Sequence, residues 1–166
     1  MAPEPPPRDN GELLGSFYQA LSSRRLGYDT LMWQVPALSL SGQAFLFTIA
    51  LGNGSSPAAR FIASGLAFIL ALISMQLMSK HRYHEELNSR LLEKIELTTE
   101  LHTILGFAPH SPKATRQAIP VRANWFTRRS SYRIWMGGLG LFACASLGVV
   151  ALTALSLVPG MPRWLP

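Results

Sequence analysis

Three long apolar runs with no charged residue in their interior constrain this chain more than any other feature. They cover residues 31–51, 60–78 and 134–158. A helix needs about 20 mainly apolar residues to cross a hydrocarbon core of about 30 Å, and each run is close to that length or longer. Backbone polar groups in lipid must be satisfied within the segment, which favours helices over strands. We therefore expect an all-α integral membrane protein with three transmembrane helices; a soluble helical bundle is the alternative.

Turn residues set the limits of these spans. Pro57 follows a loop of Gly, Asn and Ser residues and suits a first helical position. Pro159 and Gly160 end the third run. The expected segments are a transmembrane hairpin over 31–79 with spans 31–51 and 57–79, a third transmembrane helix over 132–158, and a tail over 159–166.

The basic residues predict the orientation. The net charge is +6, and ten Lys and Arg residues lie between positions 80 and 133, whereas the loop 52–59 has none. Cytoplasmic loops of membrane proteins carry an excess of Lys and Arg. We expect a multi-pass protein of the plasma membrane, with the amino terminus and the 80–133 segment in the cytoplasm and the carboxyl terminus outside.

Two segments are expected ahead of the first span. Residues 1–9 are rich in proline and predict a disordered tail. In residues 10–30 the apolar side chains recur with helical spacing. They are Leu13, Leu14, Phe17, Tyr18 and Leu21. We interpret this segment as an amphipathic cytoplasmic helix, which lies either on the membrane surface or against the chain's own central helix.

The second span runs into polar residues without a helix breaker, so we expect its helix to extend through 80–106 in the cytoplasm. Apolar side chains recur there at spacings of three and four, which is typical of a helix that packs against a partner helix. This seam comprises Leu87, Leu91, Ile95 and Leu101. The partner is another subunit, another protein, or the amino-terminal helix of the same chain.

Residues 107–131 lack periodicity and contain three prolines, five basic residues and no acidic residue. We interpret them as a basic linker, because Lys and Arg beside a span attract anionic lipid headgroups. No nucleic-acid partner is expected, since no recognised binding module accompanies the basic residues. The residues expected at anionic headgroups are Arg24, Arg25, Arg128, Arg129 and Arg133.

Small and polar residues mark expected contacts between the spans. Small residues at four-residue spacing are typical of helix–helix contact faces, within the chain or between subunits. They are Ala63, Ala67, Ala71, Gly140, Cys144 and Gly148. In the first span, Pro36, Ser39 and Gln43 either bond neighbouring helices or line a pore in an oligomer.

No catalytic pattern is recognisable, so we expect neither an enzyme nor a cofactor. His81, His84 and Glu85 share one helical face at a spacing that zinc tolerates. No fourth ligand is identifiable, and the neighbouring Lys80 and Arg82 oppose a cation, so we assign no metal site. The one cysteine excludes a disulfide framework within the chain.

The hairpin over 31–79 and the polar helix that begins SKHRYHEELNSRLLEKIE resemble the layout of SLATT-type bacterial membrane domains. The resemblance covers residues 31–105 and lies in the order of the segments; the third span is additional to that two-span layout. It implies an effector role in a nucleotide-sensing conflict system.

Two functions are consistent with these features. The first is a non-enzymatic scaffold or accessory subunit of the membrane, which binds a protein partner through residues 80–106 or lipid headgroups through the basic linker. The second is an oligomeric channel or membrane-disrupting effector lined by polar residues of the first span. Oligomeric state separates the two functions, because three helices cannot enclose a path by themselves.

Overall fold

The computed structural model describes residues 10–99, 101–122, 124–125 and 130–158. Within these residues the protein is built of helices and turns and has no strand, so the predicted all-α class is confirmed for them. The expected tails over 1–9 and 159–166, together with Arg128 and Arg129, lie outside the described residues.

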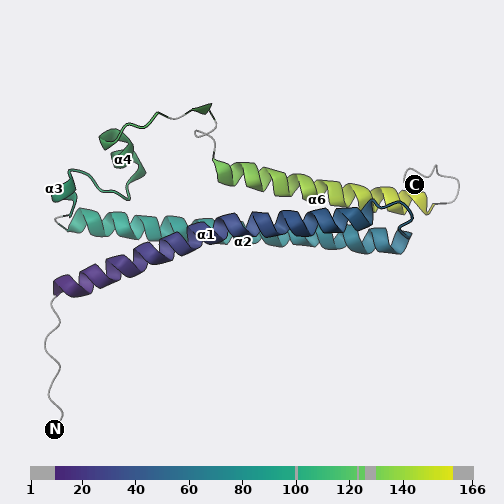
Figure 1. Cartoon of the computed structure of the whole chain (residues 1–166), viewed down its shortest axis with the longest axis horizontal. Coiled ribbons are helices and arrows are strands. Elements are labelled where there is room, and N and C mark those ends of the chain that lie inside the picture. Colours follow the sequence, from purple (N-terminus) through teal and green to yellow (C-terminus); the bar gives the residue numbers. More distant parts are fainter. Residues whose placement is uncertain (1–9, 100, 123, 126–129, 159–166) are drawn as a thin grey trace, which may run out of the picture. The chain divides into compact units, whose positions relative to one another are not determined.

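Two long helices, α1 (Asn10–Ala50) and α2 (Pro57–Thr98), form a hairpin (Figure 1). We expected a separate helix over 10–30, but α1 continues from it into the first apolar run as one helix of 41 residues. The junction contains only one weak breaker, Gly27, and a single glycine costs a helix about 1 kcal/mol. The helix α2 likewise continues into the polar segment, but it ends at Thr98 rather than at residue 106.

The turn between α1 and α2 is held by its own polar groups. The amide of Ala59 donates to Ser56 Oγ at 3.2 Å, which is the N-cap that this serine supplies to α2. Arg60 is buried and donates from Nε to the carbonyl of Ser55 at 3.2 Å and from Nη2 to the carbonyl of Gly52 at 3.4 Å. The guanidinium therefore ties the start of α2 to two carbonyl groups of the turn, and the amide of Ser55 also donates to one of them, that of Gly52, at 3.2 Å.

The segment expected to be an irregular linker over 107–131 contains a helix. A short helix, α3 (Leu101–Leu105), precedes this segment and is followed by Gly106, whose φ is +74°. The next helix, α4 (Pro112–Ala118), begins after Ser111. We took Pro112 as a sign of irregular structure, but it occupies the first turn, where a missing N–H costs nothing. The last helix, α6, spans Ser131–Ser156.

The chain divides into two compact units. The polar unit comprises Met1–Thr30 and His81–Arg122, and the apolar unit comprises Leu31–Lys80 and Ala123–Pro166. Each unit thus combines part of α1 and part of α2; the polar unit also contains α3 and α4, and the apolar unit also contains α6.

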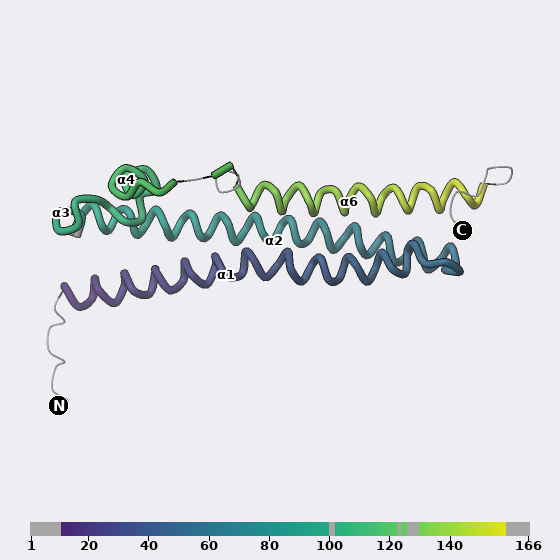
Figure 2. The backbone as a smooth tube through the Cα atoms, turned by 45° about the horizontal axis from the view of Figure 1, so that its top comes forward, coloured from purple at the N-terminus to yellow at the C-terminus, as the bar shows by residue number. Residues whose placement is uncertain are grey.

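In the apolar unit, α6 lies alongside the hairpin, as the backbone trace shows (Figure 2). Met32, Met78 and Leu139 form one buried cluster, and Ala50, Ala63 and Val149 form another. Each cluster takes one residue from each of the three helices, so the unit is a three-helix bundle. Among the described residues, α2 and α6 are long and apolar enough to cross a membrane, with a mean hydropathy of 2.1 in their most apolar segments; α1 is not one of them.

Candidate functional site

The polar unit buries carboxylates where a helix pair usually buries leucines. Glu85, Asn88, Leu92 and Glu96 of α2 are buried, and their spacing of three or four residues places them on one helical face. The unit is therefore organised around hydrogen bonds and ion pairs, because a buried carboxylate must be paired.

Glu96 is fully buried and is the centre of this network. The Tyr18 hydroxyl donates to Glu96 Oε1 at 2.7 Å, and the backbone N–H of His110 donates to Oε2 at 3.0 Å. Nδ1 of His110 also contacts Oε1. One carboxylate thus joins α1, α2 and the segment between α3 and α4.

The network changes the acidity of its members. Burial by itself raises the pKa of Glu96, but the hydrogen bonds from His110 and Tyr18 outweigh it and lower the pKa below its ordinary value. Burial, together with the hydrogen bond to the Glu96 carboxylate and its charge, raises the pKa of Tyr18 to about 12. Glu96 is therefore held as the anion and Tyr18 as the neutral phenol.

A second buried carboxylate pairs with two arginines. Glu85 Oε1 accepts from Arg25 Nε at 3.1 Å, and Glu85 Oε2 accepts from Arg82 Nη1 at 3.0 Å. Arg25, which we expected at lipid headgroups, therefore has one side occupied within the chain. Arg24 and Arg133 are exposed, as that expectation requires.

Two histidines of α2, His81 and His84, contact an aromatic ring. The Tyr28 ring stacks on His84 at a centroid distance of 5.0 Å and lies 6.0 Å from the His81 ring. Burial, followed by the nearby His84, lowers the pKa of His81. Among the described residues no group of three His, Cys, Asp or Glu side chains is arranged to hold a metal ion.

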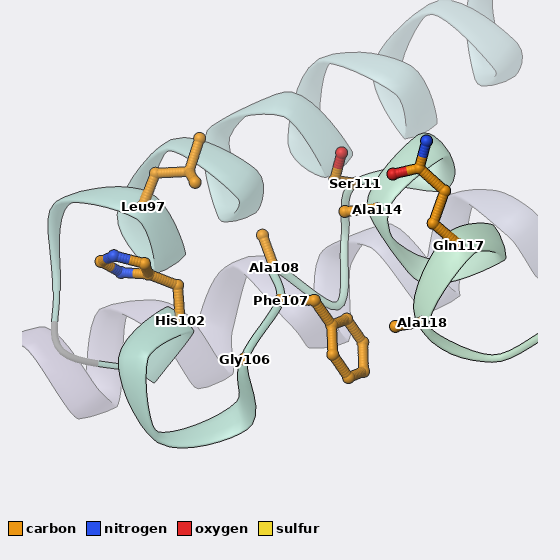
Figure 3. Close-up of a pocket in the computed structure, with 9 residues that line it drawn as sticks. All are labelled: Leu97, His102, Gly106, Phe107, Ala108, Ser111, Ala114, Gln117 and Ala118. Carbon is orange, nitrogen blue, oxygen red and sulfur yellow. The ribbon is translucent and has the colours of Figure 1, made fainter.

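A pocket of about 510 Å³ lies beside α3 and α4 (Figure 3). Leu97 and His102 line one end, and Ser111 and Gln117 line the other. His102 Nδ1 lies 2.7 Å from the carbonyl of Thr99 and 3.1 Å from that of Glu96, so its N–H caps the carboxyl end of α2. The polar group at this end of the pocket is thus used for structure.

The polar residues of the first apolar run lie inside the apolar unit. Pro36, Ser39 and Gln43 are buried on α1. Nε2 of Gln43 donates to the carbonyl of Ala67 on α2 at 2.9 Å. Among the described residues, Gln43 Oε1 and Ser39 Oγ are buried without a hydrogen-bond partner. Gln43 thus bonds two helices within the chain.

The two rows of small residues differ in position. Ala63, Ala67 and Ala71 are buried on α2. On α6, Gly140 is half-buried and Cys144 and Gly148 are exposed. The face of α6 that is buried within the chain is a different one, formed by Leu139, Ala143, Ser146, Val149 and Thr153. Contact through the Cys144 row, if formed, involves another molecule.

The predicted seam is turned away from the buried carboxylates. Leu87 and Leu91 are 42% and 40% exposed, and Ile95 is half-buried. The side chain of Leu101 lies outside the described residues. On α1, Tyr18 is half-buried and Leu21 is buried, whereas Leu13, Leu14 and Phe17 are exposed.

Sequence reasoning missed the network around Glu96. The local pattern places Tyr18 only on an apolar face and predicts no role for Glu96 or His110. The signal was present in the helical period of Glu85, Asn88, Leu92 and Glu96. The partners were not detectable in this way, because Tyr18 and Glu96 are 78 residues apart.

No known protein family, curated protein or solved structure matches this chain.

Proposed function

We propose that this chain is a non-enzymatic scaffold or accessory subunit with three transmembrane helices. The distribution of side chains in the apolar unit supports the membrane part of the proposal. Large apolar side chains are exposed on all three helices, as for Leu38 (74%), Ile62 (64%) and Leu141 (71%). The buried side chains of the same unit include many small or polar ones, such as Ala67, Ser64 and Ser146.

This distribution suits lipid better than water. Soluble proteins rarely expose contiguous apolar patches larger than a few hundred Å². Membrane helices instead pack through small residues and interhelical hydrogen bonds and turn their large apolar side chains to the lipid.

The first apolar run, over 31–51, is included as a transmembrane helix. It is less apolar than the others because it contains Gln34 and Gln43. The Gln43 amide is buried against Ala67, so it does not face lipid, while Phe45 of the same run is 66% exposed. Since an amide bonded inside a bundle does not oppose insertion, α1 is a third spanning helix in this proposal.

The ten basic residues between positions 80 and 133 support a cytoplasmic polar unit. In that orientation the exposed Leu13, Leu14 and Phe17 lie roughly 20–27 Å along the continuous α1 from residue 31, which is too far for the membrane-surface role expected of residues 10–30. Arg24 and Arg133 then lie near anionic headgroups.

The observation that carries the scaffold function is the reversed polarity of α2 in the polar unit. Its buried face holds Glu85 and Glu96, while Leu87 and Leu91 are exposed. In a helix without a further partner, burial of those leucines would be favourable, since full burial of an apolar side chain contributes about 1.5–3 kcal/mol to stability. We infer that the seam packs against a helix of a protein partner.

Site-specific photo-cross-linking in membranes tests this proposal. A photoreactive residue at position 91 is expected to form a product with a second polypeptide. The control is position 97, an exposed leucine on α2 that lies roughly a third of a turn around the helix from Leu91 at 3.6 residues per turn. Equal products at both positions, or none at position 91, would refute partner binding through the seam.

The second candidate is the oligomeric channel or effector, to which the SLATT-like layout also points. The observation in its favour is that Ser39 Oγ and Gln43 Oε1 are buried without a partner among the described residues. Such acceptors bind water readily if helices rearrange in an oligomer. Conductance of reconstituted protein that is lost in Gln43→Leu but kept in Gln34→Leu would support a channel; a wild-type protein without conductance would exclude it.

A further inference from the structure

A second pocket of the polar unit, of about 280 Å³, is lined by two arginines and a histidine among other residues. Arg25 comes from α1, His110 from the segment before α4, and Arg116 from α4. Ser89 of α2 and Thr115 of α4 add hydroxyl groups to the lining. Two regions that are distant in the sequence, α1 and residues 110–116, thus bring two guanidinium groups and an imidazole to one cavity.

Both guanidinium groups have donors to offer. Arg25 uses Nε for Glu85, and that carboxylate is shared with Arg82, so the charge of Arg25 is only partly neutralised. The pair also fixes the direction of the guanidinium plane. Arg116 is exposed, and among the described residues no carboxylate lies within ion-pair distance of it.

The other lining groups are fixed by hydrogen bonds. The backbone N–H of His110 donates to Glu96, and Nδ1 of its ring contacts the same carboxylate, which leaves Nε2 as the ring nitrogen available to a ligand. With Nδ1 as a donor, Nε2 donates to a phosphate oxygen in the imidazolium form. The Thr115 hydroxyl donates to the carbonyl of Pro109 at 2.9 Å and so holds α4 against the preceding segment. The cavity is therefore prepared before any ligand arrives.

We propose that this pocket binds a phosphate monoester group through Arg25, Arg116 and His110. Guanidinium groups match phosphate oxygens in pairs, and two of them around one cavity favour a doubly charged oxyanion over a carboxylate. The volume lies just below the range of about 300–1,000 Å³ that is usual for pockets of larger ligands, so the ligand is compact.

The phosphate has two sources, the headgroup of a membrane lipid or a small soluble phosphate. The proposal refines the role of Arg25 at lipid headgroups and to that extent rests on the proposed function. Binding of a soluble probe in detergent does not depend on the seam or on a membrane, so the two proposals can fail separately.

The experiment compares variants of the full chain. Inorganic phosphate and glycerol 3-phosphate are titrated into the detergent-purified protein by calorimetry. Native mass spectrometry then measures retention of phosphatidic acid, a lipid with a phosphate monoester, against phosphatidylserine. The variants are Arg116→Gln and Arg25→Lys, and the control is Lys113→Gln, which makes the same change of charge as Arg116→Gln at an exposed position of α4 outside the pocket.

Arg116→Gln is expected to weaken binding of at least one phosphate probe about tenfold or more, because it removes charge-assisted hydrogen bonds. Arg25→Lys keeps the charge near Glu85 but loses the fork, so it is expected to weaken the same probe. Losses confined to phosphatidic acid identify a lipid headgroup, and losses that include glycerol 3-phosphate identify a soluble ligand. The proposal is overturned if no probe binds, or if Lys113→Gln weakens binding as much as Arg116→Gln.

Discussion

Replacement of Glu96 by glutamine is the sharpest perturbation of the polar unit. The substitution keeps the shape of the side chain but removes its charge and one of its two acceptor oxygens. Donors from Tyr18 and His110 converge on both oxygens, so the amide either leaves the His110 N–H unpaired or turns its own NH₂ toward Tyr18 and Nδ1 of His110; in both cases these groups lose their charged acceptor. An unpaired buried donor, or the loss of hydrogen bonds to a charged group, costs about 1–3 kcal/mol, which corresponds to roughly 5- to 150-fold in a local opening equilibrium.

Hydrogen–deuterium exchange of the protein in nanodiscs measures that equilibrium. Glu96→Gln is expected to raise the exchange of amides in 85–98 and 110–118 about fivefold or more, while amides in 63–71 of the apolar unit keep their protection. Glu93→Gln is the matched control, because Glu93 lies on the same helix and makes no hydrogen bond or ion pair among the described residues. Unchanged exchange at His110 in Glu96→Gln would refute the central role of this carboxylate.

Three further predictions concern other parts of the chain. Because the pKa of Tyr18 is raised from 10.0 to about 12, the stability that its hydroxyl contributes is complete below pH 10 and is lost between pH 10 and 12. The difference in hydrogen–deuterium exchange between wild type and Tyr18→Phe should shrink over that interval. Arg60→Ala removes the charge-assisted hydrogen bonds to the carbonyls of Ser55 and Gly52 and should destabilise the apolar unit by about 1–3 kcal/mol, measured by thermal unfolding in detergent, with Arg60→Lys less affected. Cys144 is exposed on α6, so in a membrane-spanning α6 it should resist a water-soluble maleimide in nanodiscs but react in denaturing detergent. A cysteine introduced by Gln117→Cys should react under both conditions. Labelling of Cys144 at the rate of that control would count against the third span.

Local signals predicted the helices well. The start of α2 follows from Ser56 and Pro57, and its continuation past residue 79 follows from the lack of a breaker. The predicted helix boundaries were wrong where one residue type is compatible with two local structures. Pro112 starts α4 instead of marking irregular chain, and Gly27 does not interrupt α1, because one glycine costs less than a continuous helix gains from packing.

Contacts between distant residues were harder to predict. The row of Gly140, Cys144 and Gly148 satisfies a local rule for helix contact, yet the face of α6 that is buried within the chain runs through Leu139, Ala143 and Ser146. Spacing identifies faces that are able to pack, but several faces of one helix meet that condition. Which of these faces is buried depends on the sum of the contacts that each face makes with the neighbouring helices.

The amino-acid sequence by itself determined that this chain is helical and that its apolar residues gather in long runs, because both properties depend on neighbours within a few turns. Only the tertiary structure decided that Glu96 accepts from Tyr18 and His110, that Glu85 pairs with Arg25, and that Leu87 and Leu91 remain exposed. Arg25 and Glu85 are 60 residues apart, and no local pattern records such a pairing. Burial of a carboxylate is favourable only when its partners arrive from other helices, so the choice of the buried face belongs to the assembled fold.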